Sequence, residues 1–474
     1  MGGAAVTIIG GGPAGLAAAH EAQRLGAAVR VVERGLQVGG LARTVEFANH
    51  RFDVGPHRFY TTNDEVRRFF IDHAGGDVLR VRRLTRIRLG ARYFDYPLTP
   101  VATALGLGPL ECLRILASYA AAGLRRGASQ PPATFEDWVV AAFGRRLFEV
   151  FFRTYTEKVW GIPCREIGAD WAAQRIRGLG LGAALANAFG QRRAIKTLAD
   201  EFLYPRRGAG SVYEAIAARL RAGGAAVELG CIVEAVDRDG SRVTAITTRD
   251  GQGRRETRPV DRLMSSAPLS DLLAMLSPPP PQDVLAACGA LRYRSHLAVN
   301  LIVAGNPFPD NWIYVHSPDL RAARIANYRN FSPDMAPDEA TSPITVEYFC
   351  FAGDATWRMT DDALLDLARA ELAAMGFSAA GPGGAPAAGF VVRSAGAYPV
   401  IDVAHADHIA AIRAWLSQFA NLLPIGRTGL FRYNNQDHAI ATGLLGARTM
   451  LGHGRFDPWQ VNIDAAYIEA GQAA

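Results

Sequence analysis

The chain has 474 residues, 49% of them hydrophobic, so it can bury a sizeable core and is long enough for two or three domains or for one large two-domain enzyme. Its net charge of +6 suits an anionic cofactor and an anionic substrate, but no basic stripe with interleaved aromatic residues indicates nucleic-acid binding. Five scattered cysteines without a CxxC pair predict reduced thiols in a cytoplasmic protein. We expect no metal site, no signal peptide and no transmembrane segment.

A strand, a glycine turn, a helix and a second strand open the chain. The apolar run 4–9 leads into GGGPAG, a helical stretch follows, and the run 29–32 ends in an acid. The first glycine allows a sharp turn, the third allows a pyrophosphate to approach the backbone, and the last allows close helix–strand packing. The acid stands where a ribose hydroxyl is bound. We therefore predict a dinucleotide site, against the alternative of a plain βαβ unit, formed by Gly10, Gly12, Pro13, Ala14, Gly15, Glu33 and Arg34.

Hydrophobic periodicity predicts the remaining elements. Helices are expected over 64–74, 97–126, 134–152 (with Thr134 and Asp137 as its cap), 170–177, 212–222, 361–375 and 440–451. Strands are expected over 52–57, 79–96 (two or three), 227–236 with a following hairpin, 292–304 and 344–351, and the tail has an apolar run at 422–426.

The segment after Glu33 decides which dinucleotide is expected. Gly39-Gly40-Leu41-Ala42-Arg43 resembles the GG motif of two-dinucleotide-binding-domain flavoproteins, the group of amine oxidases, phytoene desaturases, protoporphyrinogen oxidases and UDP-galactopyranose mutases. The resemblance implies non-covalent FAD, with Arg43 near a phosphate or the flavin, unless it is an ordinary solvated loop arginine.

Four further motifs resemble eukaryotic-type UDP-galactopyranose mutases. They are DVGPH at 53–57, the block 134–176, WIYV with LRAARIANY at 312–328, and RYNNQDH at 432–438. They follow the family order along the whole chain.

The resemblance implies a substrate site rich in arginines and aromatic residues. Arg175, Arg321 and Arg432 would hold a substrate diphosphate through guanidinium forks and, with His57 at the flavin face, form the catalytic set. The implied substrate contacts are Tyr96, Trp160, Arg175, Trp312, Tyr314, Arg321, Tyr398, Arg432 and Tyr433, although either tryptophan could belong to the core and His57 could be a packed histidine.

The remaining cofactor contacts are spread over the chain. The polar cluster at 435–438 would face the FAD ribityl chain and the substrate, with a helix N-terminus near the pyrimidine end of the flavin. The implied contacts are Gly40, Leu41, Ala42, Arg43, His57, Val233, Gly426, Asn435, Gln436 and Asp437.

Two departures from the family concern the base of the nucleotide. Thr99 replaces a glutamine, and the segment Thr156-Glu157-Lys158 lacks an asparagine found in the fungal enzymes. Both family positions serve the uracil, so the diphosphate is better supported than UDP itself.

The resemblance leaves two chemistries open. In the first, reduced FAD interconverts pyranose and furanose forms of a nucleotide-diphosphate sugar without net oxidation, with NAD(P)H as the reductant. In the second, the protein is an FAD-dependent oxidoreductase, similar to desaturases or protoporphyrinogen oxidases, with an anionic substrate. A non-enzymatic flavoprotein scaffold is a third alternative.

The predicted fold is α/β, with a discontinuous Rossmann-like FAD-binding domain and an inserted α+β substrate domain. The expected boundaries assign 1–85, 203–268 and 395–474 to the FAD-binding domain, and 86–202 and 269–394 to the substrate domain.

Overall fold

A five-stranded parallel sheet carries the N-terminal glycine turn in the computed structural model, which describes residues 4–98, 100–125, 132–169 and 201–461. The strand order is β20-β13-β1-β2-β9. The strands are β1 (Ala5–Ile9), β2 (Ala28–Val32), β9 (Ala226–Glu228), β13 (Arg262–Ser265) and β20 (Leu422–Pro424). The predicted strand–turn–helix–strand unit is confirmed, and strands from distant parts of the chain complete its sheet.

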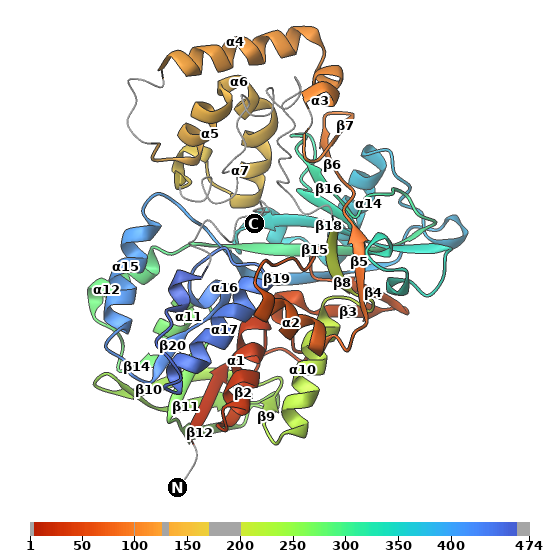
Figure 1. Ribbon diagram of the computed structural model, residues 1–474. Coiled ribbons are helices and arrows are strands. Elements are labelled where there is room, and N and C mark those ends of the chain that lie inside the picture. Colours follow the sequence, from red (N-terminus) through yellow and green to blue (C-terminus); the bar gives the residue numbers. More distant parts are fainter. Residues whose placement is uncertain (1–3, 99, 126–131, 170–200, 462–474) are drawn as a thin grey trace.

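Four helices pack beside this sheet. They are α1 (Pro13–Arg24), α2 (Asp64–His73), α10 (Gly210–Ala222) and α17 (Gln436–Met450). The red α1 and the blue α17, from opposite ends of the chain, lie side by side (Figure 1). Gly443 permits this contact, because a Cβ there would overlap the Ala14 carbonyl oxygen. The buried residues of α1 are mostly alanines, which also keeps the two helices close.

A mixed sheet of order β12-β11-β10-β14, in which β10 and β14 run parallel and the other pairs antiparallel, lies beside the parallel one. Its strands are β10 (Ile232–Asp239), β11 (Arg242–Arg249), β12 (Arg255–Pro259) and β14 (Leu276–Ser277). Helix α11 (Leu269–Ala274) precedes β14 in the chain, and helix α12 (Gln282–Gly289) follows it. The predicted hairpin is confirmed. The single strand predicted over 227–236 is wrong, because the amides of Gly230 and Cys231 bond the carbonyls of Gly35 and Glu33 and divide it into β9 and β10.

The largest sheet has seven strands in the order β19-β15-β18-β17-β16-β6-β7. Only the β6–β16 pair is parallel. The strands are β6 (Thr85–Leu89), β7 (Arg92–Asp95), β15 (Tyr293–Ala304), β16 (Trp312–Val315), β17 (Arg324–Asn327), β18 (Thr341–Cys350) and β19 (Gly389–Pro399). Helix α14 (Asp361–Ala374) packs its apolar side chains against this sheet.

A group of helices forms one end of the molecule, above the large sheet in Figure 1. They are α3 (Pro100–Leu107), α4 (Pro109–Arg125), α5 (Phe135–Phe143), α6 (Arg145–Leu147), a π-helical turn (Phe148–Arg153) and α7 (Thr154–Trp160). The predicted cap is confirmed, since Thr134 Oγ1 accepts a bond of 3.1 Å from the Asp137 amide. The continuous helix predicted over 134–152 is wrong, because Gly144, at φ +84°, ends α5 where the chain touches the Tyr119 backbone.

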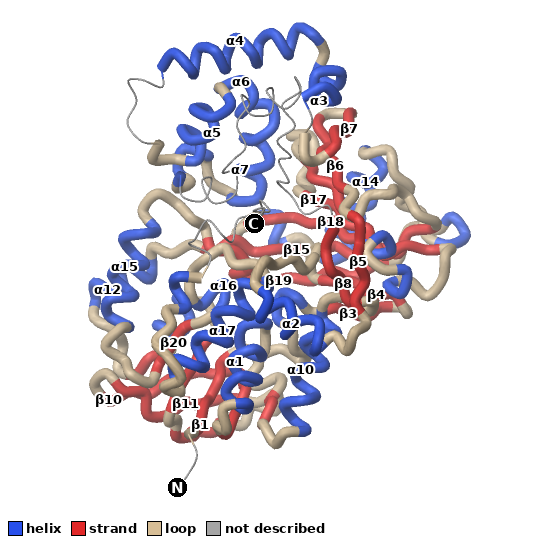
Figure 2. The backbone as a smooth tube through the Cα atoms, viewed as in Figure 1, coloured by secondary structure: helices blue, strands red, loops and turns tan. Residues whose placement is uncertain are grey.

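Two small ladders join the sheets. Strand β3 (Thr44–Phe47) pairs with β4 (His50–Asp53), and β5 (Val78–Arg82) pairs with β8 (Glu201–Pro205). The tube drawing in Figure 2 shows these short red strands between the parallel sheet and the large one.

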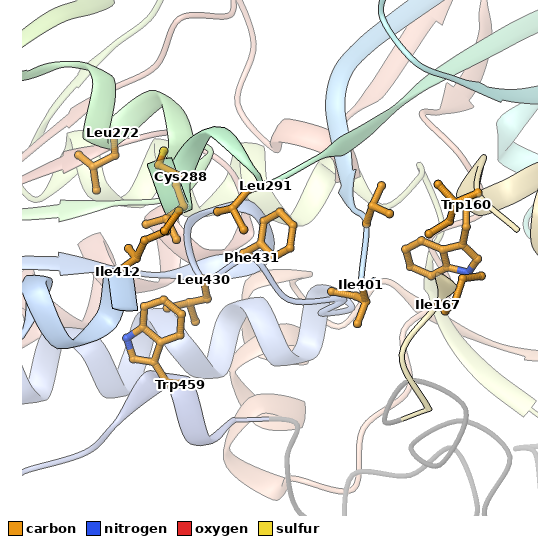
Figure 3. Close-up of a cluster of buried hydrophobic side chains, with 14 of the residues drawn as sticks. Trp160, Ile167, Leu272, Cys288, Leu291, Ile401, Ile412, Leu430, Phe431 and Trp459 are labelled. Atoms are coloured by element: carbon orange, nitrogen blue, oxygen red, sulfur yellow. The ribbon is translucent and has the colours of Figure 1, made fainter. Parts of the chain in front are cut away.

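An apolar cluster crosses the molecule from α11 and α12 to the end of α7. It includes Leu272, Leu291, Phe431 and Ile401, and reaches Trp160 (Figure 3). Helix α15 (His405–Leu416) contributes Ile412 to it.

The mixed α/β architecture confirms the predicted fold class. The predicted domain boundaries at 86 and 395 fall inside β6 and β19, and β14 pairs with β10 rather than with the large sheet. All five cysteines are free thiols. Within the described ranges, none of the helices has the length and apolar character needed to cross a membrane.

Candidate functional site

The N-terminal glycine turn has the geometry of an anion site. Gly10 adopts φ +98°, and a Cβ on it would overlap the Ser266 hydroxyl, while a Cβ on Gly15 would overlap the Gly10 carbonyl oxygen. Helix α1 begins without a side-chain cap. Within the described part of the chain, the amides of Ala14 and Gly15 in its first turn bond no acceptor. Unpaired amides at a helix N-terminus favour a phosphate.

The GG motif lies directly against this turn. The Gly39 amide donates to the Gly11 carbonyl at 2.8 Å, and a Cβ on Gly40 would lie 3.2 Å from the Gly12 Cα. Arg43 donates from Nη1 to the Gly40 carbonyl at 2.7 Å, and burial lowers the pKa of its guanidinium. Ala42 is buried and Leu41 is partly buried. The two glycine segments therefore pack directly against each other.

Glu33, directly after β2, holds the glycine turn through its carboxylate. Its carboxylate accepts bonds from the amides of Gly11 at 2.6 Å and Gly35 at 2.7 Å. The Glu33 carbonyl accepts a bond from Cys231, which brings the start of β10 and Val233 to this side. Arg34 is exposed beside it. Gly426 closes the other side, where a Cβ would lie 2.9 Å from Ala14 Cβ. Because small residues and free amides meet here, these residues fit a dinucleotide such as FAD.

The N-terminus of α17 holds the loop that carries His57. Gln436 accepts a bond from the Tyr213 hydroxyl at 2.7 Å and donates to the His57 and Arg58 carbonyls, both at 3.1 Å. Asn435 caps the helix, and its amide donates to His438 Nδ1. Burial raises the pKa of the Asp437 carboxyl. Gln436 thus acts on His57 through hydrogen bonds to the main chain.

His57 is a neutral imidazole. Its Nδ1 donates to the Gly55 carbonyl at 2.7 Å, so Nε2 carries the free lone pair. Burial, together with the charge of Arg427, lowers the pKa of His57 to about 3.

A buried ion cluster lies directly beside this loop. Arg324 on β17 binds both carboxylate oxygens of Glu347 on β18, and His296 on β15 donates to the same carboxylate at 2.7 Å. Burial alone would raise the pKa of Glu347, but the Arg324 guanidinium and the bond from His296 hold it at about 2. A Cβ on Gly55 would lie 2.9 Å from Glu347 and 3.8 Å from Arg324. Three strands of the large sheet therefore fix a charged cluster against the His57 loop.

Half-buried tyrosines form a wall next to this cluster. The ring centroids of Tyr96 and Tyr155 lie 5.3 and 5.5 Å from that of Tyr314, and those of Tyr398 and Tyr433 are 5.8 Å apart. Within the described ranges, the hydroxyls of Tyr155, Tyr314 and Tyr398 have no hydrogen-bond partner in the protein. Burial raises the pKa of Tyr155 and Tyr398, so both remain neutral donors. Such a wall can stack on a sugar and donate hydroxyls to it.

Arg427 places a positive charge against the rings of the tyrosine wall. Its Cζ lies 4.9 Å from the Tyr398 ring centroid and 5.1 Å from that of Tyr433, and its Nε donates to the Asn434 carbonyl at 2.6 Å. Among the described residues, no carboxylate forms an ion pair with it. A half-buried guanidinium stacked on aromatic rings and free of a carboxylate is suited to an anionic ligand.

The three arginines predicted from sequence differ in position: Arg321 is exposed, Arg432 lies on the loop of Arg427 and Tyr433, and Arg175 is outside the described residues. Arg321 is exposed, and its amide donates to Glu371 at 2.5 Å. Arg432 is half-buried near Arg413 and Asp457, and burial lowers its pKa. No cation–π contact joins either guanidinium to a wall tyrosine in the described part of the chain, although Arg432 directly precedes Tyr433 and its amide donates to the Arg427 carbonyl at 2.9 Å. Arg175 and Thr99 fall outside the described residues.

The two predicted tryptophans are core residues with contacts to the wall. Trp160 is 1% exposed and its ring centroid lies 5.5 Å from that of Tyr433. Trp312 is buried against Phe202 and Phe331, 6.2 Å from Tyr314, and Arg58 lies over it at 6.0 Å. Each therefore supports a wall tyrosine from behind.

The sequence interpretation missed Arg324, Arg427, Tyr155, His296 and Glu347. Arg427 directly follows the predicted Gly426, and Arg324 stands three residues after Arg321 in the same motif. The period-2 pattern of a strand at 324–327 would have placed Arg324 on one face of a buried sheet, and a buried arginine requires an acid partner.

Several solved structures are similar to this chain over nearly its whole length. Reduced UDP-galactopyranose mutase has a TM-score of 0.81 and 22% identity, and the match covers 97% of both chains. A putative protoporphyrinogen oxidase from Exiguobacterium sp. has a TM-score of 0.72 and 16% identity, with 96% of this chain and 100% of that one covered. Putrescine oxidase has a TM-score of 0.61 and 16% identity, with 95% and 99% covered. At these identities the similarity establishes the fold alone.

Curated relatives match over shorter stretches. A probable UDP-galactopyranose mutase of Klebsiella pneumoniae is 24% identical over 174 residues, which are 35% of this chain and 43% of that protein. A carotenoid 3,4-desaturase of Haloarcula japonica is 43% identical over 65 residues, 14% of this chain and 13% of that protein. The matches thus span less than half of either relative. The family model of flavin-containing amine oxidoreductases matches residues 13–388. The chain therefore belongs to the flavin-containing amine oxidoreductase family, and as a flavoenzyme of that family it is expected to use FAD.

Proposed function

We propose that this flavoenzyme interconverts the pyranose and furanose forms of a nucleotide-diphosphate sugar without net oxidation. The observation that carries the proposal is Arg427, a carboxylate-free guanidinium stacked on Tyr398 and Tyr433 beside the His57 loop. Its neighbours Tyr155 and Tyr314 offer hydroxyls suited to a sugar. The similarity to UDP-galactopyranose mutase supports the same substrate class.

Each group in this arrangement has a separate task. Bound FAD, once reduced by NAD(P)H, would supply a nucleophile for the anomeric carbon. Arg427 binds the diphosphate and stabilises its charge as the glycosidic bond breaks. The tyrosine wall orients the sugar and excludes water. His57 keeps Nε2 as a hydrogen-bond acceptor near the reacting groups, because its Nδ1–H is held by Gly55.

The buried ion cluster of Glu347, Arg324 and His296 gives this site a rigid structural support. Arg324 is neutralised by Glu347, so it is less free than Arg427 to bind a new anion. The cluster lies close against Gly55, so a side chain at that position would displace the loop that carries His57.

The absence of a lysine from strand β15 counts against a simple amine oxidase. Amine oxidases of the resembling group keep a lysine on a substrate-domain strand near the flavin, whereas β15 contains none. Lys158 Nζ donates to the carbonyls of Val315, Ser317 and Ala322, and burial lowers its pKa to about 8. It therefore serves to fasten α7 to the large sheet.

The test compares oxidised and reduced enzyme on a panel of nucleotide sugars that extends beyond uridine. Oxidised enzyme should be inactive, and reduction by NAD(P)H or dithionite should start turnover without stoichiometric consumption of reductant. Substrate loss with oxidised enzyme, or hydrogen peroxide formed together with product, would instead establish the alternative, an FAD-dependent oxidoreductase related to desaturases or protoporphyrinogen oxidases.

Arginine variants locate the diphosphate. Arg427→Met should keep FAD yet weaken nucleoside-diphosphate binding by at least about tenfold, because a lost charge-assisted bond costs about 1.5–3 kcal/mol. Arg432→Met is the matched control, because Arg432 is half-buried on the same loop and, among the described residues, its guanidinium stacks on no wall tyrosine. If Arg432→Met or Arg321→Met weakens binding and Arg427→Met does not, the diphosphate site is the one expected from the sequence.

A further inference from the structure

Helix α4 exposes its apolar face and turns its polar face towards the protein. Its inner face carries Glu111, which binds Arg146, and Ser118, which accepts a bond from the Arg146 amide, with Ile115 as the buried apolar residue. Its outer face carries leucines and alanines. Figure 1 shows α5, α6 and α7 on one side of α4 only. A surface helix normally turns its apolar stripe to the core.

The exposed stripe is continuous along the helix. Leu110 is 62% exposed, Leu113 65%, Leu116 46% and Leu124 88%. Ala117, Ala120 and Ala121 are exposed between them, and Arg114 at the edge is the one charged residue that is exposed within residues 109–124. Helix α3, which contacts α4, exposes Leu105 at 82%. Contiguous apolar surface of this kind marks an interaction site.

The order of residues along the stripe is self-complementary. Leucines occupy the N-terminal half of the stripe at 110, 113 and 116, and alanines occupy the C-terminal half at 117, 120 and 121, followed by Leu124. If a second α4 packs antiparallel across a two-fold axis at Ala117, Leu110 of one helix faces Leu124 of the other, and Leu113 faces Ala121. The leucine half of each helix then packs on the alanine half of its partner, and these small residues let the helix axes approach to roughly 8 Å.

We propose that α4 is the two-fold interface of a homodimer, with the stripe Leu110, Leu113, Leu116, Ala117, Ala120, Ala121 and Leu124 as its contact surface. A single charge at the rim, Arg114, produces little like-charge repulsion across the axis. A standard interface buries about 800 Å² per partner. Helix α4 is only about 25 Å long, so the pair of α4 helices covers part of that area and the dimer dissociates on dilution.

Sedimentation equilibrium of the FAD-loaded full chain tests the association. The wild type should show a concentration-dependent mass that approaches twice that of the chain, and Leu113→Glu should raise the dissociation constant at least about tenfold. Leu84→Glu is the control, since Leu84 is also partly exposed at 43% but lies outside α3 and α4. A wild-type chain that stays monomeric at every concentration overturns the proposal.

Cross-linking tests the axis. In a Cys112→Ser background, Ala117→Cys should form an intermolecular disulfide on mild oxidation, because the two-fold axis brings the two positions together. Gly123→Cys, exposed on the flank of the same helix, should not. Equal cross-linking at both positions rejects the antiparallel register. Binding to anionic phospholipid vesicles that Leu113→Glu abolishes, without any dimer, would assign the stripe to a lipid surface instead.

Discussion

The imidazole of His57 stays neutral at physiological pH, since burial and the Arg427 charge lower its pKa to about 3. Its NMR signals should therefore show no titration from about pH 5 to 9. The unfolded chain binds this proton near pH 6.5, so the contribution of His57 to stability is lost as the pH falls from 6.5 towards 3. An inflection near pH 6.5 would contradict the assignment. His57→Ala should slow turnover and leave nucleotide affinity nearly unchanged.

Individual residues of the site were predictable to different degrees. The glycines and Glu33 follow from local backbone requirements, which a motif contains in full. Arg427 and Arg324 depend on partners far away in the chain: the first needs Tyr398 and Tyr433, the second needs Glu347 and His296. A motif cannot tell which of two neighbouring arginines meets such partners. The pairing of β17 with β18 in the large sheet decides that Arg324, and not Arg321, meets Glu347.

At the scale of elements, Glu21 joins three helices. This buried carboxylate on α1 binds Arg24 at 2.7 Å and Arg448 of α17 at 2.6 Å, and Arg448 also binds Glu65 of α2. Burial alone would raise the pKa of Glu21, but the two arginines lower it to about 2. Glu21→Gln should cost on the order of 1–3 kcal/mol at pH 7. Because the lowered pKa stabilises the fold only while the unfolded carboxyl is ionised, the difference should shrink as the pH falls from 4.5 to 2.

Urea midpoints of Glu21→Gln and Glu65→Gln measure this effect. Glu65 binds the same arginine, but its side chain is 47% exposed, so its removal should cost less. Equal midpoints for the two variants at pH 7 would show that burial of Glu21 contributes nothing.

Periodicity predicted most helices and strands, and it failed at glycines. The helix expected over 134–152 breaks at Gly144, and the strand expected over 227–236 divides at Gly230. In both places the apolar pattern continues through the break. The residues on each side of Gly144 pack into one apolar cluster, whereas Val227 before Gly230 and Val236 after it pack into two different clusters. The early start of α17, at Gln436 rather than residue 440, has another cause: its first turn is polar yet buried, and it bonds the His57 loop.

At the scale of the whole molecule, the cofactor site unites segments that no local pattern connects. Residues 10–15 and 426 approach each other because β1 pairs with β13 and β13 pairs with β20, and residues 39–43 join them through the bond from the Gly39 amide to the Gly11 carbonyl. The sequence implied a discontinuous domain through family resemblance, but the order of strands is a property of the assembled sheets. FAD should therefore act as a cross-link between distant parts of the chain and raise the melting temperature on binding.

Two glycines of the same turn separate the cofactor's contribution from that of the fold. Gly12 has φ −81° and a Cβ there would meet only Gly40, at 3.8 Å, so Gly12→Val should leave the melting temperature of the apoprotein nearly unchanged. The side chain would nevertheless block the phosphates, and added FAD should no longer raise the melting temperature. Gly10→Val, by contrast, should lower the melting temperature of the apoprotein itself, because Gly10 has φ +98° and its Cβ would overlap Ser266. Thermal melts of both apoproteins with and without FAD check this, and a Gly12→Val protein that binds FAD fully would refute the assignment of the turn.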